Sequence, residues 1–214
     1  EALTAWFENF PDVPLPDEIV DSSHGLNRVL SSPVFSAKPV PDFPRSTMDG
    51  YAIRAKDSFG ASESLPAYFS IIGEISMGKS PDFSIDVGQA ALIHTGGMIP
   101  DGADAVVMLE HTQTYSRKEL EVTRSVATAE NVIQIGEDIP EGQMVLPAGT
   151  ILQPADIGGL MALGQTRVRV YKKPRIGVLS SGDEIIDPGL EPLGGQVRDI
   201  NAYSISANIE KWGG

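Results

Sequence analysis

Short apolar segments alternate with Gly-rich turns through the middle of the chain. Segments of this length, bounded by turn residues, are typical of β-strands. The clearest candidates are residues 67–75, 90–94, 105–110 and 119–124. Residues 41–130 are therefore predicted to form a mostly β domain.

The sequence clearly predicts one helix, over residues 154–164. Pro154 suits the first turn of a helix, where its missing N–H costs nothing, and Gly164 suits the end. The apolar side chains at helical spacing between them are Ile157, Leu160 and Met161. Strands are predicted on both sides of this helix, at 132–135 and 144–146 before it and at 167–170 after it.

The two ends of the chain carry weaker patterns. Residues 17–30 fit a helix whose apolar positions share one face. Near the other end, the apolar run 175–179 and a polar turn precede a second helix candidate at 202–212. The order strand, loop, helix is typical of the start of an α/β sheet, and a parallel sheet needs further strands. We therefore expect the α/β domain that begins at 173 to be incomplete.

Composition narrows the function classes. The chain has 16 Lys and Arg against 29 Asp and Glu, which gives a net charge of −13. Nucleic-acid binding is not expected, because it needs positive charge to neutralise phosphates. No apolar run approaches the roughly 20 residues of a membrane helix, and without cysteine there is no disulfide framework. We expect a cytoplasmic protein without a membrane segment.

Two motifs place a carboxylate or a hydroxyl beside glycine in a turn. Asp49 precedes Gly50, and Thr95 precedes the glycines at 96 and 97. Backbone N–H groups in such turns can bind an anion, and Thr95 would add a hydroxyl donor. Plain turns of a β domain are the alternative, since Asp-Gly and Gly-rich turns are common.

A third set of residues consists of carboxylates in loops. Glu137 and Asp138 follow Gly136, and Asp183 follows the strand predicted at 175–179. Such carboxylates suit Mg²⁺, which binds one or two of them together with substrate phosphates. A solvated acidic surface is the alternative. The three histidines, His24, His94 and His111, lack zinc-ligand spacing and are expected to be structural.

Taken in order, six segments resemble the molybdopterin molybdenumtransferase family, which includes MoeA and gephyrin. They are Ser46-Thr47-Met48-Asp49-Gly50-Tyr51-Ala52, Thr95-Gly96-Gly97 with Pro100 to Val107, Gly136-Glu137-Asp138-Ile139, Gly149-Thr150, residues 154–164, and Ser181-Gly182-Asp183-Glu184. Each motif is weak alone, and their common order carries the resemblance. It runs from about Leu26 to the last residue.

The resemblance implies a multidomain fold that is mainly β with α+β parts. A split, elongated domain would comprise residues 1–40 and 131–172, and a β domain would be inserted at 41–130. Residues 173–214 would begin an α/β molybdopterin-binding domain. The resemblance also implies a homodimer with the active site between subunits. It further implies that the chain is the N-terminal portion of a longer enzyme and is inactive alone.

The family's reaction follows from the same resemblance. Its members take adenylylated molybdopterin and molybdate, insert the metal and release AMP, with Mg²⁺ required. By position, the resemblance assigns catalytic roles to Asp49, Thr95, Glu137 and Asp183. Substrate-binding roles fall on Ser46, Gly96, Asp138, Ser181, Gly182, Asp199 and Asn201. Mg²⁺ would be held by Glu137, Asp138 and Asp183.

The chain departs from the family pattern at one positive charge. Many members have an arginine where this chain has Ile133, Gln134 and Ile135. The candidates to replace it are Arg45, Lys79 and Arg198. The alternative to an enzyme is a non-catalytic scaffold or binding module that keeps the family fold. The sequence leaves open whether molybdate or tungstate is preferred.

Overall fold

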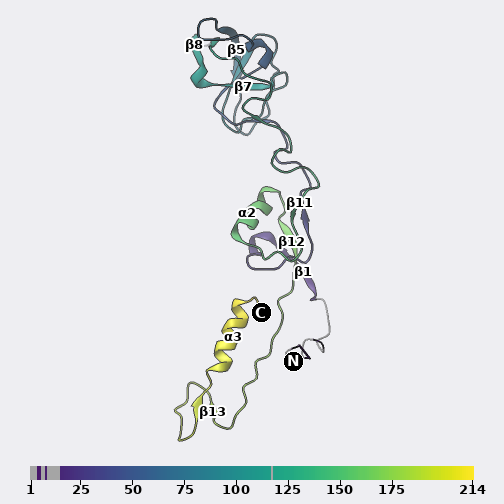
Figure 1. Ribbon diagram of the computed structural model, residues 1–214, viewed down its shortest axis with the longest axis vertical. Coiled ribbons are helices and arrows are strands. Elements are labelled where there is room, and N and C mark those ends of the chain that lie inside the picture. Colours follow the sequence, from purple (N-terminus) through teal and green to yellow (C-terminus); the bar gives the residue numbers. More distant parts are fainter. Residues whose placement is uncertain (1–3, 6–7, 9–14, 117) are drawn as a thin grey trace. The chain divides into compact units, whose positions relative to one another are not determined.

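The computed structural model describes residues 4–5, 8, 15–116 and 118–214. Its contacts divide the chain into two units (Figure 1). Unit 1 consists of Glu1–Val34 and Met144–Gly214, and unit 2 consists of Phe35–Gln143. Unit 2 is therefore inserted into the sequence of unit 1.

Unit 2 is built around a six-stranded sheet. In chain order its strands are β4 (Gly50–Ile53), β5 (Ala67–Glu74), β6 (Gln89–Ile93), β7 (Ala105–Met108), β8 (Thr112–Ser116) and β9 (Glu119–Val122). Their spatial order is β7-β4-β6-β5-β9-β8, and all neighbours are antiparallel except β5 and β6. The mainly β fold is confirmed, and β5, β6, β7 and β9 are the four strands predicted from the apolar segments.

The sheet curls, because a short connection joins its two outermost strands. β7 and β8 stand at opposite ends of the strand order, yet only the 3₁₀ turn η3 (Leu109–His111) separates them in the chain. Apolar side chains form two clusters, one on each face. The first cluster includes Tyr51, Ile53, Phe69, Val107 and Leu120, and the second includes Ala52, Ile75, Ile93, Ile99 and Val106. Successive residues of β4 thus face different clusters, as pleating requires.

Short strands complete unit 2 and its ends. β3 (Arg45–Ser46) pairs antiparallel with β10 (Val132–Ile133). β2 (Val34–Phe35) pairs with β11 (Met144–Leu146), and the 3₁₀ turn η2 (Ala55–Ser58) follows β4. β10 and β11 confirm the strands predicted before the helix, although β10 is shorter than predicted.

Unit 1 packs a two-stranded sheet against a helix. β1 (Asp17–Asp21) pairs antiparallel with β12 (Arg167–Tyr171), the 3₁₀ turn η1 (Ser22–His24) follows β1, and α2 spans Pro154–Ala162. Their core contains Leu30, Leu152, Leu160, Val168 and Val170. The predicted helix and the strand after it are confirmed, and Gly164 adopts a φ of 69° just beyond the helix.

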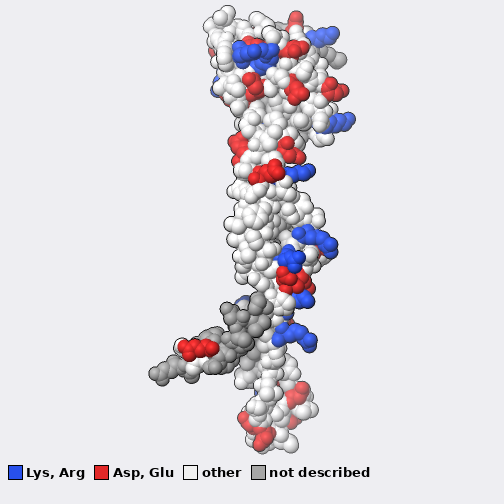
Figure 2. All heavy atoms as spheres, turned by 90° about the vertical axis from the view of Figure 1, so that its right-hand side faces the viewer, with Lys and Arg blue, Asp and Glu red and all other residues white. Residues whose placement is uncertain are grey.

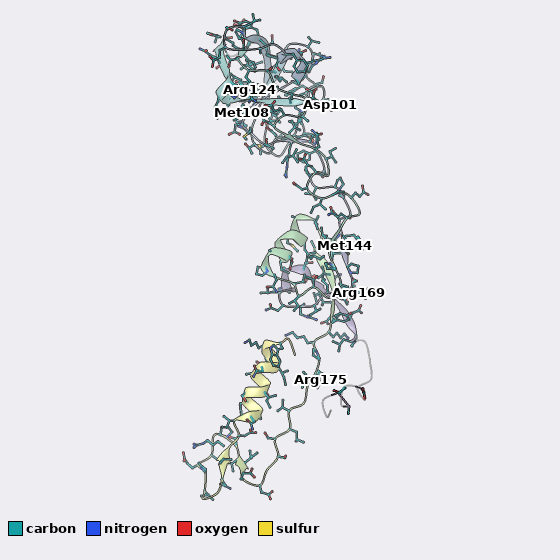
Figure 3. The ribbon with its side chains drawn as sticks, in the orientation of Figure 1. Asp101, Met108, Arg124, Met144, Arg169 and Arg175 are labelled. Carbon is teal, nitrogen blue, oxygen red and sulfur yellow. The ribbon has the colours of Figure 1, made fainter. Side chains whose placement is uncertain are left out.

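The helix predicted at 17–30 is wrong, because β1 occupies its first turn. Asp17 and Asp21 on β1 form ion pairs with Arg169 and Arg167 of β12, with N–O distances of 3.1 and 3.6 Å (Arg169 is labelled in Figure 3). Asp17 and Arg169 are 152 positions apart in the chain. A distant partner strand has therefore overridden a weak local helical pattern.

The last segment of unit 1 carries two short strands and a helix. β13 (Ile185–Ile186) and β14 (Val197–Arg198) are parallel, and α3 spans Asn201–Lys211. α3 confirms the helix predicted at 202–212. The strand predicted at 175–179 is wrong, since these residues, which begin at Arg175 in Figure 3, pair with no other strand and Leu179 is 91% exposed. An apolar run becomes a strand only where a neighbour can hydrogen-bond to it.

Charged side chains of both signs are scattered over the surface among other residues. Figure 2 shows Lys and Arg interspersed with Asp and Glu on the face in view. Several charges are paired, as in Arg124–Glu130, with an N–O distance of 3.0 Å. Exposed pairs of this kind contribute about 0–1 kcal/mol each. Among the described helices, none is long and apolar enough to span a membrane.

Gly50 is the tightest backbone position of the sheet, and Gly50→Ala should destabilise unit 2. A Cβ at Gly50 would overlap the carbonyl oxygen of Val107 on the neighbouring strand. Overpacking of this kind costs about 1–3 kcal/mol or more, measured as the free energy of urea unfolding. As a control, Gly158→Ala in α2 meets open space and should stabilise by about 0.5–1 kcal/mol. Equal stability of Gly50→Ala and wild type would contradict this packing.

Candidate functional site

Strand β3 joins the motifs of unit 2. The Ser46 N–H donates to the Gly97 carbonyl over 2.9 Å, and the Gly96 N–H donates to the Ser46 carbonyl over 2.8 Å. On its other side, β3 pairs with β10, which places Arg45 opposite Ile133. The Ser46 hydroxyl is buried and donates to the Met48 carbonyl over 2.6 Å. The Ser46 side chain therefore holds the turn that leads to the next motif.

The carboxylate of Asp49 is fixed by Thr95. Asp49 Oδ1 accepts the Thr95 backbone N–H over 2.7 Å and the Thr95 hydroxyl over 3.1 Å. The backbone hydrogen bond, followed by the hydroxyl hydrogen bond, holds the pKa of Asp49 below its ordinary value. The structure thus brings together two residues that were predicted separately, and Asp49 is exposed and ionised at neutral pH.

His94 lies beside Asp49, and Glu74 lies beside His94; the sequence reasoning missed both. His94 Nδ1 lies 3.9 Å from Asp49 Oδ1, and His94 Nε2 lies 3.0 Å from Glu74 Oε1. His94 was expected to be structural, yet its ring stands between two carboxylates. Its position directly before Thr95 was the available signal for His94. For Glu74 there was none, because it comes from the end of β5, 20 positions away.

The third motif, Gly136-Glu137-Asp138, is joined to β3 by an ion pair. Arg45 Nη2 lies 3.2 Å from Asp138 Oδ2, with both side chains partly exposed. Glu137 accepts the Gln134 N–H over 2.8 Å and is also exposed. Among the described side chains, Lys79 forms no ion pair with these residues, and Arg198 binds Glu191 in unit 1. Of the three candidate cations, Arg45 is the one that the structure joins to a predicted site residue.

The predicted residues of unit 1 gather around β13 and β14. Ser181, Gly182 and Asp183 precede β13, whereas Asp199 follows β14 and Asn201 is the first residue of α3. Asp199 Oδ1 accepts the Ala202 N–H over 3.0 Å. This hydrogen bond and a second one from the Ser180 hydroxyl lower the pKa of Asp199. Asp199 therefore caps α3 and ties the polar turn before β13 to the start of the helix.

Few side chains that could bind a divalent cation lie close together among the described residues. No group of three or more His, Asp or Glu side chains there is close enough to hold a metal by itself. Mg²⁺ in phosphate-transfer sites is held by one or two carboxylates, with substrate oxygens completing its shell. Glu137 and Asp138 are adjacent, exposed carboxylates of this kind. Their chemistry fits Mg²⁺ only if a substrate supplies the remaining oxygens.

The chain is similar to one well-defined protein family. The family model described as the MoeA N-terminal region (domain I and II) matches residues 1–164. A molybdopterin molybdenumtransferase of Nostoc sp. is 36% identical over 92% of this chain and 45% of its own length. One from Haemophilus influenzae is 32% identical over 99% of this chain and 51% of its own length.

A solved structure shares the fold. The molybdopterin biosynthesis MoeA protein from Pyrococcus horikosii matches with a TM-score of 0.89 and 35% sequence identity, over 98% of this chain and 53% of that chain. The chain thus spans about half the length of the relatives that it matches.

The Asp49–Thr95 contact predicts a pH-dependent signal. The Thr95 amide proton should titrate with Asp49 at a midpoint below the ordinary value of about pH 4, followed by NMR. Because the folded pKa is lowered, the contact stabilises fully above that ordinary value and is lost as pH falls through the folded pKa. Thr95→Val removes one donor and should raise the midpoint.

The matched control is Thr112→Val, whose hydroxyl binds the Leu109 carbonyl instead. That variant should leave the midpoint of the Thr95 amide unchanged. A wild-type midpoint at or above the ordinary value would show that Thr95 does not stabilise the Asp49 carboxylate.

Proposed function

Because the chain belongs to the MoeA N-terminal family, we propose that it is part of an enzyme of molybdenum cofactor biosynthesis. The reaction would insert molybdate into adenylylated molybdopterin and release AMP. The observation that carries the proposal is the meeting of three motifs at β3, where Asp49 with Thr95 and Arg45 with Asp138 share one hydrogen-bonded framework. The names of the curated relatives support the same pathway.

Asp49 is the proposed catalytic carboxylate of this framework. Its low pKa keeps it charged, and Thr95 fixes its orientation. Molybdate and adenylate are both anions, so a fixed carboxylate beside them has a use only where a cation or a proton lies between. The N–H groups of the Gly-rich turn, including Gly96, and the Ser46 turn would help to orient the oxyanion.

The cation would be Mg²⁺. The carboxylates that the family resemblance assigns to it are Glu137, Asp138 and Asp183. When bound, it would polarise the phosphoanhydride as a Lewis acid. Glu137 is proposed as a catalytic residue for that reason, whereas Asp138 would also orient Arg45 through their ion pair.

Arg45 is proposed to replace the arginine that many family members carry near position 133. Arg45 lies directly opposite Ile133 in the pairing of β3 with β10. Cross-strand neighbours on one face have their Cβ atoms about 5 Å apart. The Arg45 guanidinium on β3 would therefore lie close to the position that the side chain of an arginine on β10 would occupy. It would bind an oxyanion there.

The remaining roles follow the family resemblance. Ser181, Gly182, Asp199 and Asn201 would bind the substrate in unit 1. The proposed domains remain residues 1–40 with 131–172, residues 41–130, and residues 173–214. We propose further that the protein is a cytoplasmic homodimer and that the native polypeptide continues beyond residue 214. An intact mass of the native polypeptide equal to that of these 214 residues would overturn the last point.

A scaffold or binding module is the second candidate function, favoured by Ile133, where the family arginine is missing. Calorimetry on the native full-length protein separates the two. Mg²⁺-dependent binding of adenylylated molybdopterin supports the enzyme. No binding of the nucleotide, with the fold and oligomeric state retained, supports the scaffold.

Asp49→Asn should abolish the proposed reaction while keeping the fold. Asparagine can still accept the Thr95 hydrogen bonds but carries no charge. Loss of a preorganised electrostatic group typically costs about 10²–10³-fold in rate, measured as molybdate-dependent AMP release by the full-length protein. Asp82→Asn, at another exposed loop position, is the control and should retain the wild-type rate. A wild-type rate in Asp49→Asn would remove Asp49 from the site.

Arg45→Gln should weaken the use of molybdate. Loss of one charge-assisted contact should raise the KM for molybdate about tenfold with a smaller change in kcat. Arg124→Gln is the matched control, because Arg124 also forms an ion pair in unit 2 (3.0 Å from Glu130), away from the motifs. Equal KM values in both variants would argue against Arg45 as the anion anchor.

A further inference from the structure

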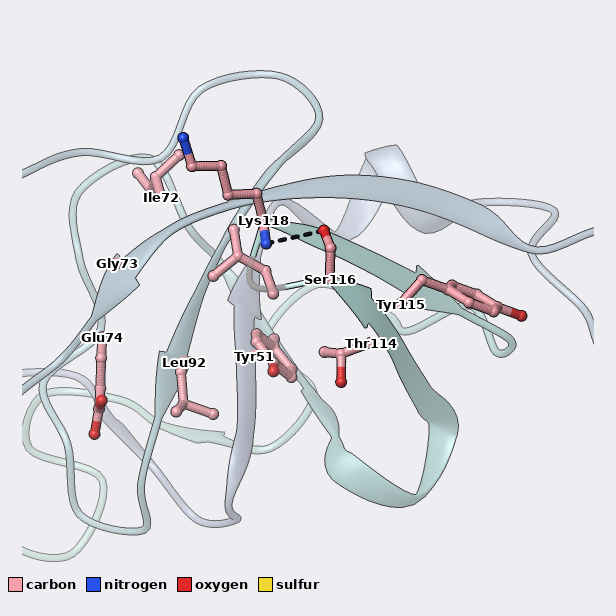
Figure 4. Close-up of a pocket in the computed structure, with 10 residues that line it drawn as sticks. Tyr51, Ile72, Gly73, Glu74, Leu92, Thr114, Tyr115, Ser116 and Lys118 are labelled. Carbon is pink, nitrogen blue, oxygen red and sulfur yellow. Dashed lines mark hydrogen bonds between the residues drawn. The ribbon is translucent and has the colours of Figure 1, made fainter.

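The curled sheet of unit 2 leaves a hollow at one end, over the first apolar cluster. Its volume is about 670 Å³, within the range of about 300–1,000 Å³ that is usual for small-molecule sites. Figure 4 shows the side chains that line it, from β4, β5, β6, β8 and the connection between β8 and β9. The lining includes Tyr51, Ile71, Glu74, Leu92, Thr114 and Lys118.

Irregular strands shape this hollow. On β5, Ile71 pairs with Ala90 and Glu74 pairs with Leu92, so three steps on β5 match two steps on β6. This bulge turns Glu74 toward the face that Ile71 already occupies. β8 has a second register shift, between Thr114 and Ser116. Bulges re-aim side chains and are enriched beside functional sites and at barrel rims, and both bulged segments line the hollow.

The floor of the hollow is apolar with one polar atom. Ile71 and Leu92 are partly buried and pack against the first cluster, and Tyr51 is only 7% exposed. The Tyr51 hydroxyl has no hydrogen-bond partner among the described residues, and no fully buried side-chain oxygen there lacks one. The hydroxyl is therefore open to the hollow, as Figure 4 shows. Burial raises the pKa of Tyr51, so the hydroxyl stays protonated and can donate.

The charge at the rim favours an anion near one side. Lys118 is the one basic residue among the described lining residues. Its ammonium group forms no ion pair with a described side chain. Its backbone is fixed, because the Lys118 carbonyl accepts the Ile71 N–H over 2.9 Å. Glu74 is the one acidic residue of that lining, and it is engaged by His94 Nε2 at 3.0 Å.

We propose that this hollow binds a small organic monoanion with a flat apolar body, such as an aryl carboxylate. The flat body would rest on Leu92 and the Tyr51 ring. The carboxylate would accept hydrogen bonds from the hydroxyls of Tyr51 and Thr114, and the Lys118 side chain, which points away from both in Figure 4, would turn toward it on binding. This binding is independent of molybdenum insertion, because it uses none of the residues proposed for that reaction.

The test is an NMR titration of the native full-length protein with 2-naphthoate, compared with its neutral analogue 2-naphthalenemethanol. Saturable shifts of the amides of Tyr51, Leu92 and Thr114 are expected with the carboxylate. Lys118→Gln should weaken the binding of 2-naphthoate up to about fivefold, the range of an exposed ion pair. Tyr51→Phe should weaken it about threefold to tenfold through one lost hydrogen bond.

Matched controls make the outcome decisive. Lys56→Gln removes an exposed lysine of unit 2 that does not line the hollow, and it should leave the affinity unchanged. The neutral analogue should bind more weakly than 2-naphthoate and should not respond to Lys118→Gln. The proposal is overturned by shifts that do not saturate, by equal affinity of the two probes, or by equal effects of Lys118→Gln and Lys56→Gln.

Discussion

The backbone of β3, which consists of Arg45 and Ser46, holds the candidate site of unit 2 together. Ser46 bonds to the Gly-rich turn through its N–H and its carbonyl, while β3 as a whole pairs with β10 on the other side. Backbone hydrogen bonds do not depend on which side chains are present, so the framework persists where a side chain has changed. The proposed replacement of the family arginine by Arg45, which lies opposite Ile133, rests on this framework.

Much of the fold was predictable because it rests on local signals. Four of the six strands of the curled sheet, β5, β6, β7 and β9, are apolar segments between turn residues, and α2 begins at Pro154 and ends before Gly164. The motifs were also visible as separate pieces. The contacts between them were not, because the Asp49–Thr95 and Arg45–Asp138 pairs join residues 46 and 93 positions apart. No spacing rule in one sequence gives such distances.

The errors have physical causes as well. At 17–30 a loosely helical pattern gave way to β1, whose partner β12 comes from the second segment of unit 1. At 175–179 an apolar run had no strand beside it. His94 was predicted to be structural because the histidines lack zinc-ligand spacing. In the fold it lies next to two carboxylates. In each case the missing information was the identity of a distant neighbour.

The insertion of unit 2 into unit 1 has a consequence for synthesis on the ribosome. Every strand of the curled sheet has been made by Val122, whereas β1 must wait for Arg167–Tyr171 before it can pair. Domains generally fold as units as they emerge, so unit 2 should be complete while β1 is still an unpaired strand. β1 carries Asp17, Glu18 and Asp21. Charges on an exposed strand discourage pairing with other chains, so the same aspartates that later bind arginines on β12 would protect the nascent chain from aggregation.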